Sequence, residues 1–72
     1  MKAMRELVFE VNEESDGGYT AEALGEGIFT QGDTWEELRA MVLDATKGYF
    51  YDSKPPARIR LHLLRDEVLL VA

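Results

Sequence analysis

The sequence contains no cysteine and only one histidine, His62. Disulfide bonds are therefore impossible, and a zinc site built from thiolates and imidazoles cannot be assembled. A chain of 72 residues forms one domain, and domains of this size commonly add a disulfide, a metal or a partner subunit to a small core. We therefore expect neither a metal nor a cofactor, and self-association is the remaining means of support.

Long apolar runs are also missing. No stretch approaches the roughly 18 residues of a membrane-spanning helix, and residues 1–6 lead into an acidic, strand-like segment instead of an apolar signal core. We expect a soluble protein that does not contact membranes. The absence of cysteine and of an export signal predicts a cytoplasmic location.

Basic residues are absent from nearly half of the chain. Ten of the 14 Asp and Glu residues lie between Glu6 and Glu37, where there is no Lys or Arg, and the net charge is −6. This segment repels phosphate backbones, so we expect no direct contact with nucleic acid. It attracts basic protein surfaces, although acidic residues can also serve solubility alone.

Alternating apolar residues separated by glycine-containing turns predict four strands. They are expected near residues 4–11, 19–24, 28–30 and 58–65. Residues 67–71 either continue the last strand or fold back as a further one.

A capping box, formed by Thr34 and Glu37, predicts a helix near residues 34–50 with one apolar face. Residues 1–72 are thus predicted to form one α+β domain in the order β-β-β-α-β. Its two layers are an antiparallel sheet and one helix across one face of that sheet.

No motif combines side chains for catalysis. His62 lies in a predicted strand without a nearby nucleophile or second histidine. The carboxylate pairs are explained by a loop, a helix cap and a turn; they are Glu13-Glu14, Glu36-Glu37 and Asp66-Glu67. Trp35 can be either a core residue or an interface anchor. We expect no catalytic and no metal-binding residue, and hence a protein that is not an enzyme.

Two motifs resemble the HicB-type antitoxin family. They are Gly18-Tyr19-Thr20-Ala21, and Thr30-Gln31-Gly32-Asp33-Thr34 followed by the glutamates that begin the helix. The resemblance implies a β-β-β-α-β domain that is partly similar to double-stranded-RNA-binding domains or to ribonuclease H. In that family the domain neutralises HicA, a small basic mRNA-cleaving toxin, by covering its surface. Full-length members add a DNA-binding domain, so the resemblance is to a stand-alone HicB-like N-terminal domain.

Two functions follow as hypotheses. The first is an antitoxin-type protein-binding module for a HicA-like toxin, with acidic residues as the contact candidates: Glu10, Glu13, Glu14, Asp16, Glu22 and Glu26. The alternative is an orphan structural or regulatory domain that forms a homodimer or higher homo-oligomer and has no toxin partner. The self-association candidates are the apolar residues near the end, which are hard to bury in a two-layer monomer: Val68, Leu69, Leu70 and Val71.

Overall fold

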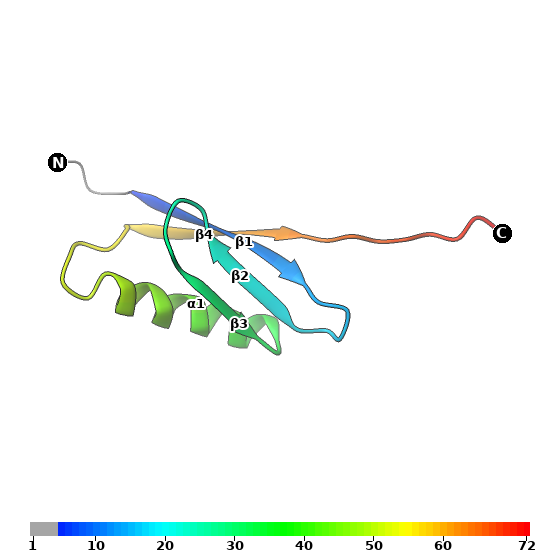
Figure 1. The fold of residues 1–72 in the computed structure, drawn as a ribbon, viewed down its shortest axis with the longest axis horizontal. Coiled ribbons are helices and arrows are strands. Elements are labelled where there is room, and N and C mark those ends of the chain that lie inside the picture. Colours follow the sequence, from blue (N-terminus) through cyan, green and yellow to red (C-terminus); the bar gives the residue numbers. More distant parts are fainter. Residues whose placement is uncertain (1–4) are drawn as a thin grey trace.

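The computed structural model describes residues 5–72, which form four strands and one helix. In chain order they are β1 (Glu6–Glu13), β2 (Tyr19–Ala23), β3 (Phe29–Gly32), α1 (Trp35–Tyr49) and β4 (Arg58–Leu64). The strands form one sheet in the order β3-β2-β1-β4, and α1 lies across one face of it (Figure 1). The predicted α+β class and two-layer β-β-β-α-β arrangement are confirmed.

One strand pairing differs from the prediction, because the sheet is mixed and not wholly antiparallel. β1 pairs antiparallel with β2, and β2 antiparallel with β3. β1 and β4 pair in parallel, with Leu7 opposite Ile59 and Phe9 opposite Leu61. The cause is the connection: α1 crosses the sheet and returns the chain to the end at which β1 begins, so β4 must run in the same direction as β1.

The core lies between α1 and the sheet. Alternate residues of β1, namely Leu7, Phe9 and Val11, are buried, and Leu38 and Val42 of α1 pack against them. The remaining buried residues are Ala21, Ala23, Ile28, Thr30 and Thr46. The even-numbered residues of β1 consequently point to the other face of the sheet.

The start of α1 is fixed by side-chain caps. Thr34 Oγ1 accepts a hydrogen bond from the Glu37 backbone N–H at 3.0 Å, and Glu37 Oε1 accepts one from the Asp33 N–H at 2.7 Å. Half-buried Trp35 meets Tyr19 edge to face, with ring centroids 5.3 Å apart, and packs against the core. Within residues 5–72, no helix is long and apolar enough to cross a membrane.

Residues 65–72 continue beyond β4 without regular secondary structure and project past the sheet (Figure 1). We call this segment the tail. Its apolar residues are 77–96% exposed; they are Val68, Leu69, Leu70 and Val71. A further strand at residues 67–71 is therefore not formed within the single chain.

Candidate protein-binding face

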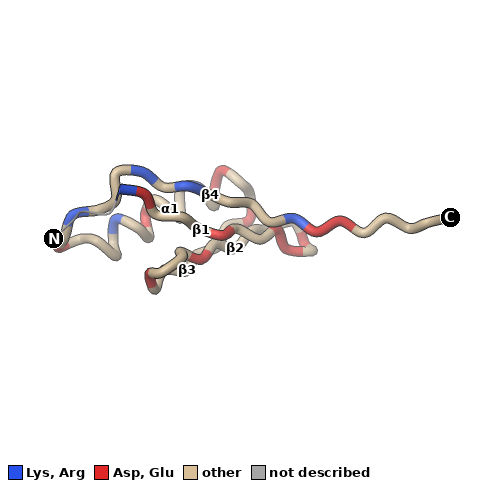
Figure 2. The backbone as a smooth tube through the Cα atoms, turned by 90° about the horizontal axis from the view of Figure 1, so that it is seen from above, with Lys and Arg blue, Asp and Glu red and all other residues tan. Residues whose placement is uncertain are grey.

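The face of the sheet opposite α1 is not covered by any helix of residues 5–72. We call it the open face. Because the registers alternate, it carries Glu6, Val8, Glu10 and Asn12 of β1, Thr20 and Glu22 of β2, Phe29 and Gln31 of β3, and Arg58, Arg60, His62 and Leu64 of β4. Acidic segments lie on β1, on β2 and in the turns that follow them, whereas basic segments lie on β4 and, together with acidic ones, on α1 (Figure 2).

The centre of the open face holds two carboxylates side by side. Glu10 of β1 is directly opposite Glu22 of β2, and the next residues in this row are Phe29 of β3 and His62 of β4. Like charges at opposed positions destabilise a sheet. Among residues 5–72, neither carboxylate forms an ion pair with Lys, Arg or His. The fold thus retains an electrostatic repulsion that a cation from outside can relieve.

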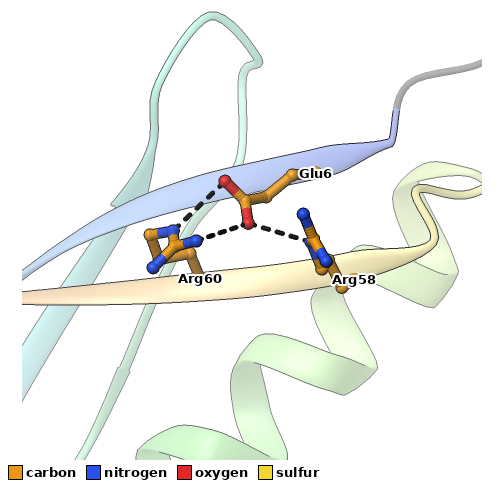
Figure 3. Close-up of polar contacts among 3 residues, drawn as sticks. All are labelled: Glu6, Arg58 and Arg60. Atoms are coloured by element: carbon orange, nitrogen blue, oxygen red, sulfur yellow. Dashed lines mark hydrogen bonds and ion pairs between the residues drawn. The ribbon is translucent and has the colours of Figure 1, made fainter.

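Glu6, by contrast, is neutralised by two arginines of β4 (Figure 3). Its Oε1 accepts a hydrogen bond from Arg60 Nε at 3.1 Å, and its Oε2 accepts from Arg60 Nη2 and from Arg58 Nε, both at 3.0 Å. The hydrogen bonds from Arg60 are the main cause that holds the pKa of Glu6 below its ordinary value, against partial desolvation, and the charges of both arginines add to it. The same contact raises the pKa of Arg60. Two cations face one anion, so this end of the open face has a positive charge in excess.

Three more acidic candidates lie at the turn between β1 and β2, and all three are exposed. Glu13 Oε1 lies 3.7 Å from Arg65 Nε. Glu14 Oε2 accepts a hydrogen bond from Thr20 Oγ1 at 3.3 Å, and Asp16 Oδ1 accepts one at 3.1 Å from the backbone N–H two residues later. Glu14 and Asp16 therefore stabilise the turn and keep their charge at the surface.

Glu26 lies apart from the other candidates. It is half-buried in the turn between β2 and β3, at the opposite end of β2 from the β1–β2 turn, and its backbone carbonyl accepts from the Ile28 N–H at 3.0 Å. The structure thus brings Glu10 and Glu22 together, places Glu13, Glu14 and Asp16 at one end, and separates Glu26 from both groups.

Phe29 is a candidate that the sequence analysis missed. Its side chain is 64% exposed and lies beside Glu22 on the open face. The available signal was the strand predicted near residues 28–30, because strand alternation places Phe29 on the side opposite Ile28 and Thr30, and the structure shows these two residues to be buried. An exposed aromatic ring beside two carboxylates is a typical anchor at a protein interface.

The one histidine of the chain also lies on the open face. His62 is exposed on β4, and its opposed neighbour on β1 is Glu10. Within the described part of the chain, no three His, Asp or Glu side chains are grouped so that they could hold a metal ion. The open face thus combines a pair of opposed carboxylates, an arginine cluster and an exposed aromatic ring.

Comparison with known proteins identifies two relatives. A UPF0150 protein of Thermotoga maritima is 41% identical over 71 residues, which cover 99% of this chain and 100% of that protein. A UPF0150 protein of Archaeoglobus fulgidus is 52% identical over 44 residues, which cover 61% of this chain and 67% of that protein. No family model matches the chain, and no solved structure matches it significantly. Because the similarity to the Thermotoga protein extends over nearly the full length of both chains, this protein belongs to the UPF0150 family.

Proposed function

We propose that this protein is a HicB-like, non-catalytic binding module of the antitoxin type, which neutralises a small basic mRNA-cleaving toxin by covering its surface. The observation that carries the proposal is the opposed pair of Glu10 and Glu22 on the open face. The HicB-like motifs around Tyr19 and Gly32 support it independently.

A basic partner gains more from this pair than from two isolated carboxylates. In the free protein, Glu10 and Glu22 repel each other across neighbouring strands. A Lys or Arg of the partner placed between them replaces that repulsion with two attractive contacts. The exposed ring of Phe29, in the same row, supplies apolar area and a surface on which a guanidinium can stack.

The charge distribution also orients the partner. The acidic β1–β2 turn extends the negative region at one end, whereas the cluster of Glu6, Arg58 and Arg60 makes the other end positive. A basic surface is therefore drawn toward Glu10, Glu22 and the turn, and is repelled from the start of β4. Such attraction acts mainly on the association rate and weakens as salt is added.

The test is co-expression with the product of the neighbouring open reading frame, followed by calorimetric titration of the purified pair. We expect a small basic protein that binds, with Kd rising as salt rises. The double variant Glu10→Lys/Glu22→Lys should weaken binding at least about tenfold. Its matched control is Asp44→Lys/Asp52→Lys, which changes the net charge equally at exposed positions outside the open face. A neighbour that is not basic or does not bind, or an equal loss in both variants, contradicts the proposal.

A second candidate function has its own observation. The apolar residues of the tail, Val68 to Val71, are 77–96% exposed, which is unusual for a monomer because apolar side chains gain free energy when they are removed from water. We propose, as the alternative, a homo-oligomeric structural or regulatory domain without a toxin partner. A stable oligomer that binds no basic neighbour supports this alternative, whereas a monomer refutes it.

A further inference from the structure

A hollow lies between α1 and β4 on the helix side of the sheet. α1 packs mainly on β3 and β2, whereas β4 contacts β1, so α1 does not extend over the last strand. The hollow has a volume of about 160 Å³ and is lined by Arg39, Val42, Leu43, Ile59 and Leu61. A neighbouring hollow of about 310 Å³, which shares Leu43 and Ile59, continues it toward Lys47 and Arg58. We call the two together the α1–β4 groove.

The outer edge of β4 adjoins this groove. β4 is the last strand in the order β3-β2-β1-β4, so its backbone N–H and C=O groups on that side have no strand partner among residues 5–72. An exposed edge is a template for an added strand, and an apolar groove beside it accepts alternate side chains of that strand. The groove therefore suits an extended apolar segment.

The tail of the chain has the matching chemistry. It is extended and carries four exposed apolar residues, preceded by Asp66 and Glu67. The groove is lined mainly by apolar side chains and also by Arg39 and Lys47. The apolar residues of the tail thus find an apolar surface in the groove, and Glu67, which alternates with Leu69 and Val71, lies on the side that carries Arg39 and Lys47.

A chain cannot fill the groove with its own tail. The tail leaves the end of β4 in the strand direction, away from the start of β4 (Figure 1), where Ile59 is the second residue of the strand. A tight two-residue turn at residues 66–67 would pair Val71 with His62 and leave Ile59 uncovered. Such turns also favour Asn-Gly or Asp-Gly, because both residues need positive φ, and Glu67 does not suit that position.

We propose that two copies of the chain exchange tails, so that residues 66–71 of each copy lie antiparallel along the outer edge of β4 of the other. A two-fold axis perpendicular to the sheet relates the two copies. Their sheets then meet at the β4 edges, and both helices lie on the same side of the combined sheet. The exchange uses the helix side of the sheet, so it is independent of a toxin bound on the open face.

The alternation of strands specifies which tail residues enter the groove. Ile59 and Leu61 point to the helix side, because they lie opposite Leu7 and Phe9 in the parallel pair and these are core residues. Directly opposed residues of an antiparallel pair point to the same side. With both helices on one side, the odd-numbered residues Leu69 and Val71 face the groove. Val68 and Leu70 then face away from it.

This alternation gives a test with an internal control. Sedimentation velocity of the full chain at micromolar concentration should show a dimer. Leu69→Asp/Val71→Asp should weaken dimerisation at least about tenfold, whereas Val68→Asp/Leu70→Asp, with the same composition and charge, should stay close to the original chain. A monomeric original chain, or equal effects of the two double variants, overturns the proposal.

The groove is tested with a second matched pair. Leu43 on the groove and Leu24 outside it are 52% and 50% exposed, so a charge at either position is tolerated by the fold. Leu43→Glu should dissociate the dimer and Leu24→Glu should not. Circular dichroism is the control and should show that both variants remain folded. A dimer that survives Leu43→Glu unchanged contradicts docking in the groove.

Cross-linking distinguishes exchange from other dimers, because the chain has no cysteine of its own. Leu69→Cys is mixed under oxidising conditions with Ile59→Cys or with Leu61→Cys. We expect a disulfide-linked mixed dimer with one of the two, since opposed residues in a strand pair come within disulfide distance. The absence of a mixed dimer in both mixtures refutes the exchange.

Discussion

Gly32 provides the sharpest test of how the helix is held on the sheet. It is the last residue of β3, and a Cβ atom added to it would lie 2.6 Å from the backbone nitrogen and 2.8 Å from the Cα of Leu38. Ordinary contacts begin at 3.4 Å. Because the clashing atoms are backbone, no side-chain rotation relieves the contact. The first turn of α1 must therefore move away from β3 by about 0.8 Å in Gly32→Ala.

The cost of this movement can be estimated. Overpacking of a tightly packed site costs about 1–3 kcal/mol, and replacing glycine in the unfolded chain returns about 0.4–1 kcal/mol. Because the clash is between backbone atoms, the upper half of the overpacking range, about 2–3 kcal/mol, applies. The net loss is then about 1–2.6 kcal/mol, against a total stability of about 4–11 kcal/mol for 72 residues. For a domain of this size, the midpoint of thermal unfolding should fall by about 4–21 °C.

The assay is thermal unfolding followed by circular dichroism at one fixed protein concentration, because self-association would shift the midpoint. Gly48→Ala is the control. Gly48 lies inside α1 with nothing within 4 Å of an added Cβ, so alanine should stabilise the helix by about 0.5–1 kcal/mol. If Gly32→Ala unfolds at the same temperature as the original chain, the close contact between β3 and α1 does not exist as described.

Three further variants test the cap, the ion pairs and the core. Thr34→Ala should lose about 1 kcal/mol and Thr34→Ser much less, in urea titrations, because Ser keeps the capping oxygen. Glu6→Gln should lower stability at neutral pH. The pKa of Glu6 is lower in the folded chain than its ordinary value of 4.5. Ionised Glu6 therefore adds its full contribution to the free energy of unfolding above pH 4.5, and this contribution disappears as the pH falls through the lowered pKa. The difference in stability between Glu6→Gln and the original chain should accordingly vanish in acid. Phe9→Ala should lower the free energy of unfolding by about 3–5 kcal/mol in urea titrations; an unchanged free energy of unfolding would contradict the place of Phe9 in the core.

Local patterns in the sequence were sufficient to predict the helix and the buried side of β1. The capping box needs only Thr34 and Glu37, three residues apart, and the alternation of Leu7, Phe9 and Val11 fixes which side of β1 is buried. Both depend on neighbours in the chain, so a single sequence contains them. The strands near residues 19–24 and 58–65 were located for the same reason.

The pairing of strands that are far apart in the chain was harder to predict from the sequence. The direction of β4 depends on how α1 crosses the sheet, so the parallel pairing of Glu6 with Arg58 could not be read from local periodicity. The arginines of β4 neutralise Glu6. They do not neutralise Glu10, whose opposed residues are Glu22 and His62. That depends on strand register, which is set by the whole sheet.

The parallel pairing of β1 with β4 also determines the order in which the sheet can be completed. Glu6 and Arg58 are separated by 52 residues, so their contact closes the longest loop in the sheet, whereas β1, β2 and β3 join through short turns. Closing a long loop has a larger entropic cost, and contacts of this kind form slowly. Until β4 arrives, β1 is an edge strand with unpaired backbone groups and an incompletely covered apolar face. A strand that is central in the folded protein is thus the most exposed to wrong pairing during folding.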